Sequence, residues 1–132
     1  MAVDPSRVFK PINIALLTVS DTRGPEDDTS GDILAERIKK AGHTLATRAL
    51  ERDDVGVIAN RLNNWIDDQG IDAIVITGGT GLTGRDVTPE ALDRVKDQEI
   101  PGFGELFRWI SYNTLGTSTV QSRACAVLAR GT

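Results

Sequence analysis

Apolar residues along the chain occur either in continuous runs or at helical spacing. Residues 12–20 and 71–77 are almost wholly apolar and rich in β-branched side chains, which predicts strands buried on both faces. Residues 44–50 show a weaker strand pattern. The segments between these runs have apolar residues at helical spacing, so the predicted order is strand, helix, strand, helix, strand. This order predicts a parallel sheet with right-handed crossover connections.

The two intervening segments each have one apolar face, and their ends carry helix signals. The first helix is expected to follow a cap at Thr29 or Ser30 and to end at Gly42. The second is expected to follow the N-cap Asp54 and to end at Gly70. The inward residues of the first helix are Ile33, Leu34, Ile38 and Ala41. The inward residues of the second helix are Val55, Ile58, Ala59, Leu62, Trp65 and Ile66.

The rest of the chain predicts two more helices, at about residues 89–97 and 102–111, and a last strand over residues 123–130. A turn is expected at Gly131-Thr132. The residues expected to face inward from the 102–111 helix are Phe103, Leu106, Phe107 and Ile110. We therefore predict an α/β fold with three layers, α/β/α, and a mostly parallel sheet.

Composition limits the size, location and partners of the protein. A chain of 132 residues is predicted to form a single domain, 1–132. No apolar run approaches the roughly 20 residues that cross a bilayer, and the N-terminus lacks a secretory h-region. Together with the single cysteine, Cys125, this predicts a soluble, cytoplasmic protein without a membrane partner. A net charge of -4 without a basic run argues against a nucleic-acid partner.

A glycine- and threonine-rich loop follows the run at residues 71–77 and continues to Gly84. Its glycines let backbone N–H groups approach an anion, and the next helix is expected to begin at Thr88-Pro89 with a capping hydroxyl. The loop also fits G-x-G-x-x-G, but its helix starts too late for a dinucleotide site. The loop lacks a Walker A lysine, which argues against a P-loop NTPase. The sequence therefore predicts a phosphate-binding loop, and a solvent-facing turn is the alternative.

Carboxylates follow the predicted strands on the edge where ligands bind in open parallel sheets. Asp53 follows the second strand and Asp86 lies in the glycine-rich region after the third. Two carboxylates beside an anion loop suit Mg²⁺, which takes its other ligands from water and phosphate. A solvated loop acid is the alternative for Asp53. We interpret the remaining acids Asp21, Asp28 and Asp32 as turn or helix-start residues.

Two arginines and two serines are further candidates for ligand binding. Arg85 and Arg123 can supply local positive charge, although each can equally be a solvated surface residue. Ser118 and Ser122 lie in a polar loop before the last predicted strand, and turn hydrogen bonding is the alternative for them.

Several segments, taken in order, resemble the molybdopterin-binding family, which includes molybdenum cofactor biosynthesis protein B and the molybdopterin adenylyltransferases. The segments that carry the resemblance are residues 17–23, 28–31, 77–90, 101–105 and 116–123. The resemblance implies that Asp53 and Asp86 are the functional, Mg²⁺-binding aspartates. The residues it implies for substrate and phosphate binding are Ser20, Thr77, Gly78, Gly79, Thr80, Gly81, Ser118, Ser122 and Arg123. It also implies a homotrimer or homohexamer.

The activity implied by the resemblance is adenylyl transfer from Mg·ATP to molybdopterin with release of pyrophosphate. The intact run at residues 86–90 favours this enzyme. The match over residues 116–123 is nearest to the protein B branch, which favours a pterin-binding or assembly protein without catalysis. A phosphate-binding α/β domain of unrelated purpose is a third possibility. Family members continue with another strand and a Pro-Gly-Ser loop, and neither occurs in this sequence.

Overall fold

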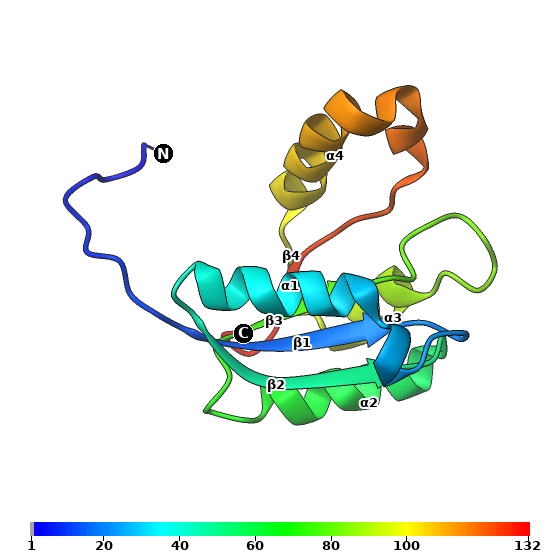
Figure 1. Cartoon of the computed structure of the whole chain (residues 1–132), viewed down its shortest axis with the longest axis horizontal. Helices are drawn as coiled ribbons and strands as arrows, with labels where there is room; N and C mark the ends of the chain where they lie inside the picture. The colour runs from blue at the N-terminus through cyan, green and yellow to red at the C-terminus, as the bar shows by residue number, and fades with distance from the viewer. Residues whose placement is uncertain (1) are drawn as a thin grey trace.

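A parallel sheet forms the centre of the molecule, which a computed structural model describes over residues 2–132. The sheet has three strands in the order β2-β1-β3. These strands are β1 (Asn13–Val19), β2 (Thr44–Glu51) and β3 (Ala73–Thr77). Helix α1 (Thr29–Lys40) covers one face, and α2 (Val55–Ile66) and α3 (Thr88–Val95) cover the other (Figure 1). The predicted three-layer α/β fold is confirmed.

The central strand β1 divides the core into two clusters. Its Leu17 and Val19 pack toward α2 and α3, whereas Ile14 and Leu16 pack toward α1. Both Leu16 and Leu17 are fully buried. Burying such a side chain contributes about 1.5–3 kcal/mol, so a strand covered on both faces needs an uninterrupted apolar run. This is the physical reason that residues 12–20 carry no polar face.

Helix α2 agrees with its predicted pattern. Its N-cap Asp54 accepts a hydrogen bond from the Val57 N–H at 2.9 Å. The buried residues of α2 are Ile58, Ala59, Leu62, Trp65 and Ile66. Helical period and cap signal therefore located the start and the buried face of α2 correctly, but the helix ends at Ile66 and not at Gly70.

Helix α1 ends before Gly42 as predicted, where Gly42 has a φ of 88°, but it differs from its prediction at the N-cap and in its buried face. The N-cap is Asp28, whose Oδ1 accepts from the Gly31 N–H at 3.0 Å, rather than Thr29 or Ser30. The buried residues of α1 are Gly31, Ala35 and Ile38. Ile33 is 53% exposed and Ala41 is exposed, so their predicted inward placement is wrong. The face that packs on the sheet therefore includes Gly31 rather than Ile33, and Gly31 approaches the Asp28–Arg48 pair.

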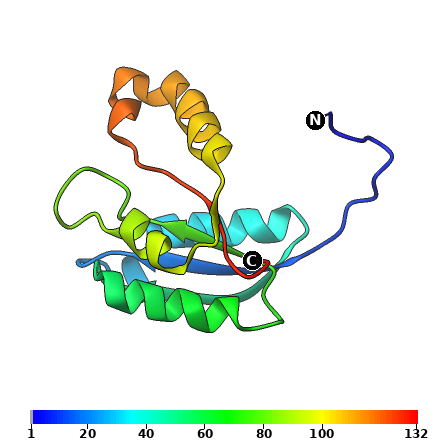
Figure 2. The ribbon, with the colours of Figure 1, turned by 180° about the vertical axis from the view of Figure 1, so that it is seen from behind.

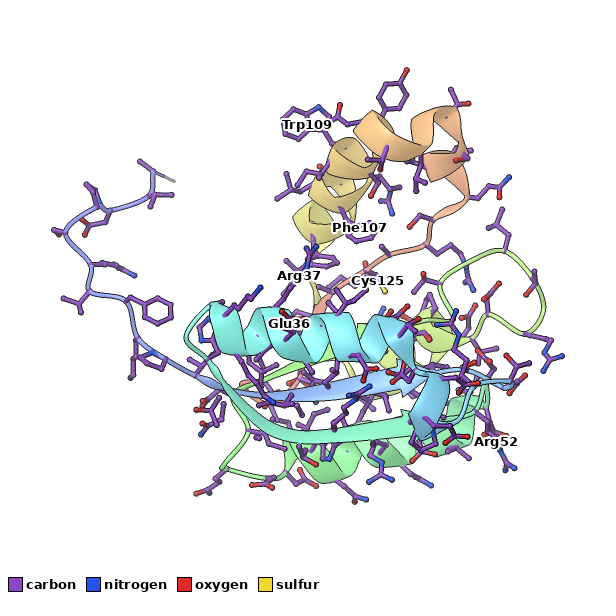
Figure 3. The ribbon with its side chains drawn as sticks, in the orientation of Figure 1. Glu36, Arg37, Arg52, Phe107, Trp109 and Cys125 are labelled. Atoms are coloured by element: carbon purple, nitrogen blue, oxygen red, sulfur yellow. The ribbon has the colours of Figure 1, made fainter. Side chains whose placement is uncertain are left out.

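Helix α4 (Pro101–Leu115) and the 3-10 helix η2 (Gly116–Gln121) project away from the layers (Figure 2). The prediction that this helix faces inward is wrong. The four residues are exposed by about half: Phe103 47%, Leu106 54%, Phe107 45% and Ile110 56%. Helix α4 packs mainly on η2 instead of the sheet. Figure 3 shows Phe107 on the side of α4 toward the body and Trp109 on the opposite side.

The last predicted strand is much shorter than residues 123–130. Only β5 (Val127–Leu128) is a strand, and it pairs antiparallel with β4 (Gln98–Glu99) outside the parallel sheet. The segment before β5 does not pair as a strand, and Arg123 in this segment contacts the glycine loop instead. A tight turn closes at Ala129–Thr132, where Arg130 and Gly131 have φ of 48° and 86°.

Among the described strands, β3 pairs only with β1, so its outer edge is open. An apolar cavity of about 460 Å³ runs along this edge and is lined by Ile74, Ile76, Val127 and Phe107, among others. Open pairing explains why β3 is only partly buried although four of its five residues are apolar. Within residues 2–132, no helix is long and apolar enough to cross a membrane.

Candidate functional site

The loops that follow the three parallel strands meet at one edge of the sheet, on the right in Figure 1. The chain leaves β1 toward α1 on one face and leaves β3 toward α3 on the other. Diverging connections leave a crevice between the ends of β1 and β3, and ligands bind at such switch points in open α/β sheets. The topology therefore selects the predicted ligand-binding edge.

Two glycines shape the start of the loop that follows β3. Gly78 and Gly79 have φ of 99° and 71°, which side-chain-bearing residues rarely adopt. A Cβ atom on Gly78 would collide with the carbonyl oxygen of Val19, and one on Gly79 would collide with the Thr88 hydroxyl. The backbone is thus drawn tightly against β1 and the start of α3.

Thr88 fastens the loop to α3 rather than capping that helix. Its hydroxyl donates to the Gly78 carbonyl at 2.8 Å, and its N–H donates to the Gly79 carbonyl at 3.0 Å. The N-cap position is Val87, which makes no side-chain cap bond. The predicted capping hydroxyl is therefore wrong, and Thr88 serves the loop instead.

Asp86 is held inside the glycine loop. Its Oδ2 accepts from the Thr83 N–H at 3.0 Å and from the Thr83 hydroxyl at 2.8 Å. These bonds lower the pKa of Asp86 below its usual value, with the Thr83 hydroxyl as the main cause. A Cβ on Gly81 would lie 2.7 Å from Asp86 Oδ2, so this carboxylate directly faces loop backbone. Asp86 is therefore an ionised oxygen donor fixed on the loop.

Asp53 reaches the same loop from the end of β2. A Cβ on Gly79 would lie 3.2 Å from Asp53 Oδ1. Burial raises the pKa of Asp53, and the negative charges of Asp21 and Asp86 raise it further. Carboxylates that repel one another in this way are stabilised by a bound cation. The structure therefore brings Asp53 and Asp86 to one loop, as the sequence predicted.

Asp21, which follows β1, contacts residues of the loops after β2 and β3. The sequence did not predict this role. Its Oδ1 accepts the Asp53 N–H at 2.9 Å, and its Oδ2 accepts Arg85 Nε at 2.8 Å. Arg85 is the main cause of the lowered pKa of Asp21, and Arg52, seen at this edge in Figure 3, adds a smaller effect. The only available signal was the position of Asp21 just after the first strand.

The remaining predicted residues lie at different distances from this edge. Ser20 follows β1, where its hydroxyl oxygen accepts from the Thr22 and Arg23 N–H groups at 3.3 and 3.2 Å. Thr77 ends β3 and lines the apolar cavity. Ser118 lies in η2 and donates to the Leu115 carbonyl at 2.7 Å, away from the loop.

Ser122 and Arg123 approach the loop from its other side. The Ser122 hydroxyl accepts from the Ala124 N–H at 3.2 Å, a local turn contact. Arg123 contacts the loop directly through its backbone and its guanidinium. The predicted phosphate contact of Arg123 stays a prediction, and its observed partners belong to the protein itself.

The donor set suits a hard divalent cation with an incomplete protein cage. Within residues 2–132, no three His, Cys, Asp or Glu side chains gather as a protein-only metal site. Asp53 and Asp86 supply carboxylate oxygens beside the loop amides. Mg²⁺ typically binds one or two carboxylates and keeps waters and substrate phosphate oxygens as its other ligands. The residues present therefore fit Mg²⁺.

A glycine-rich loop and two carboxylates lie at the switch point of a parallel sheet, the place where ligands bind in open α/β folds. Sequence comparison gives the family. The profile of the family described as "Probable molybdopterin binding domain" matches residues 15–130. The chain belongs to this molybdopterin-binding domain family, in agreement with the resemblance noted in its sequence.

Known relatives and structures agree with this assignment. The chain is 46% identical over 127 residues to molybdenum cofactor biosynthesis protein B of Escherichia coli K12, covering 96% of the chain and 75% of the relative. The tungsten cofactor synthesizing protein MoaB of Pyrococcus furiosus is 36% identical with a TM-score of 0.81, covering 94% and 77%. The molybdopterin biosynthesis Mog protein of Mycobacterium ulcerans is 27% identical with a TM-score of 0.79, covering 92% and 77%.

Proposed function

We propose that this protein acts in molybdenum cofactor biosynthesis and adenylylates molybdopterin with Mg·ATP. The observation that carries the proposal is the placement of Asp53 and Asp86 against Gly79 and Gly81 of one loop. Names of relatives from both the protein B and Mog groups support the pathway. The activity itself rests on the chemistry of the site.

The reaction joins two anions. A phosphate oxygen of molybdopterin would attack the α-phosphorus of ATP, the bond from that phosphorus to the bridging oxygen would break, and pyrophosphate would leave. A bound Mg²⁺ would neutralise charge on the phosphate oxygens. No covalent enzyme intermediate is required, so catalysis depends on positioning and electrostatic stabilisation.

The chain would contribute positioning through three groups of residues. Backbone amides of residues 78–80 and the hydroxyls of Ser20, Thr77 and Thr80 would bind phosphate, because they lie at the end of β3 or on the loops that follow β1 and β3. Asp53 and Asp86 would hold Mg²⁺. Ser118 and Ser122 would contact the pterin. Arg85, now paired with Asp21, can exchange that carboxylate for an incoming phosphate because its side chain is 70% exposed.

A pterin-binding protein without catalysis is the second candidate. The identity to the Escherichia coli protein B is 46%, whereas that to the Mycobacterium ulcerans Mog protein is 27%. The greater likeness to the protein B relative favours this candidate. Such a protein would hold the pterin phosphate on the same loop without needing Mg²⁺-dependent ATP binding.

Asp86→Asn separates the two candidates because it keeps the shape of the side chain and removes its charge. We expect the wild type to form adenylylated product and to bind ATP more tightly with Mg²⁺, and Asp86→Asn to lose both by calorimetry and product analysis. Asp93→Asn is the matched control, since Asp93 is an exposed acid that pairs with Lys96 on α3. Normal turnover by Asp86→Asn would refute the catalytic assignment. Absence of Mg²⁺-dependent ATP binding in the wild type would favour the pterin-binding protein.

We also propose that the protein assembles as a homotrimer or homohexamer. The support is the surface of α4, where Trp109 is 75% exposed and Tyr112 56% exposed beside the apolar residues described above. Large contiguous apolar surface of this kind is typical of interfaces between subunits, and aromatic residues are enriched there.

A further inference from the structure

Arg123 makes a dense set of contacts with the glycine loop. Its Nε donates to the Gly81 carbonyl at 2.8 Å, and its Nη2 donates to the Asp86 carbonyl at 2.6 Å. Its Nη1 donates to Glu90 Oε1 at 2.5 Å, on the first turn of α3. The backbone N–H of Arg123 donates to the Thr80 carbonyl at 2.8 Å. One residue therefore spans both ends of the loop and the helix that follows it.

The orientation of these contacts has a consequence for the loop amides. In a trans peptide the C=O and the next N–H point in opposite directions. The Thr80 carbonyl turns toward Arg123, so the Gly81 N–H of the same peptide turns away from it. That N–H acts on the Asp86 carboxylate and helps lower its pKa. By the same geometry, binding of the Gly81 carbonyl turns the Leu82 N–H away from Arg123.

We propose that Arg123 is a positioning residue, which fixes the glycine loop and so holds the Asp86 carboxylate beside the Gly81 backbone, and not a direct phosphate ligand. Its role in turnover rests on the adenylyl-transfer function proposed above. A loop rich in glycine has many accessible backbone conformations, so an external clamp is needed to hold one of them. Arginine suits this task because its planar fork reaches several acceptors at once.

The substitution Arg123→Lys distinguishes the positioning role from direct binding of phosphate by the positive charge. A lysine keeps the positive charge but presents one nitrogen, which cannot reach the Gly81 carbonyl, the Asp86 carbonyl and Glu90 together. A clamp is therefore lost in Arg123→Lys as well as in Arg123→Gln. A direct phosphate ligand would be largely retained in Arg123→Lys, because an ammonium also binds phosphate.

Amide hydrogen exchange on the full chain gives a readout that does not depend on activity. The N–H groups of Thr83 and Asp86 are bonded within the loop, to the Asp86 carboxylate and the Thr83 carbonyl. We expect both Arg123 variants to speed their exchange by about tenfold or more, while the amides of β1 stay protected. Glu90→Gln, which weakens only one of the partners, should give a smaller increase.

Arg130→Gln is the matched control, because Arg130 belongs to the same C-terminal segment but contacts Asn63 and Asp67 at α2. It should leave loop exchange unchanged. Calorimetry with Mg·ATP completes the test, and the clamp predicts that Lys and Gln variants weaken binding to a similar extent. Unchanged loop exchange in both variants, or Mg·ATP binding retained by Lys and lost by Gln, overturns the proposal. If the variants show faster loop exchange but the wild type does not bind Mg·ATP, the two proposals separate. The proposed enzyme function is then refuted, and the positioning role of Arg123 is still supported.

Discussion

Replacement of the buried Asp28 by asparagine tests the contribution of one ion pair beneath α1 to stability. Asp28 is 2% exposed. Its Oδ2 accepts from the Thr18 hydroxyl at 2.7 Å and from Arg48 Nη2 at 2.9 Å. Its Oδ1 caps α1 through the Gly31 N–H. Asparagine keeps the volume and the cap but places an amide group opposite the arginine.

The expected loss follows from these contacts. Asparagine caps helices as well as aspartate does, so the cap contributes little to the difference. A hydrogen bond to a charged group contributes about 1.5–3 kcal/mol, and two such bonds are weakened here. Arg48 is 30% exposed and can turn toward water and Asp32, which reduces the loss. We therefore expect Asp28→Asn to lower the free energy of unfolding by about 2–4 kcal/mol.

Urea unfolding followed by circular dichroism measures this change at pH 7. The control is Asp32→Asn, because Asp32 contacts the same arginine at 2.8 Å with a side chain that is 62% exposed. An exposed pair contributes about 0–1 kcal/mol, so this variant should remain close to the wild type. Equal losses in the two variants would refute the reasoning that burial sets the magnitude.

The dependence of stability on pH gives a second test of the contribution of Asp28. Burial tends to raise the pKa of Asp28, but hydrogen bonds from Thr18, Arg48 and Gly31 outweigh it, and the pKa is lowered. A lowered carboxyl pKa stabilises the folded state above its unfolded value of about 3.9, and that stabilisation is lost as pH falls through the folded pKa. The difference between wild type and Asp28→Asn should therefore stay constant from pH 7 to 5 and shrink below pH 4.

Two further predictions concern the loop and the surface of α4. Gly79→Ala should lower the free energy of unfolding by about 2 kcal/mol or more, because its φ is 71° and the new methyl meets Thr88. Gly84→Ala is the control, because its new methyl meets nothing within 4 Å. In the same urea assay it should change the free energy of unfolding by under about 0.5 kcal/mol. Trp109→Glu should shift the sedimentation coefficient toward that of the monomer. Val3→Glu, which replaces a still more exposed apolar residue near the N-terminus, should not. A monomeric wild type at micromolar concentration would contradict the second prediction.

Local pattern was sufficient for the elements that lie in the core. The run at β1 and the period of α2 indicated their positions correctly, because a strand or helix packed between layers must match its own repeat to the surfaces that cover it. The glycine loop was equally visible, since backbone at positive φ needs glycine. Strand order then placed Asp53 and Asp86 at one edge, as parallel topology requires.

Distant contacts decided the rest. The period of α4 was read correctly, but the period of a helix does not reveal whether the fold supplies a layer to cover its apolar face, and here Phe103 and Ile110 remain about half exposed. Asp21 meets Arg85 across 64 positions of sequence, and Arg123 meets Gly81 across 42. No local repeat encodes such a meeting. Residue chemistry identified carboxylates, glycines and arginines as candidates, and only the packing of three layers determined which arginine faces solvent and which one holds the loop.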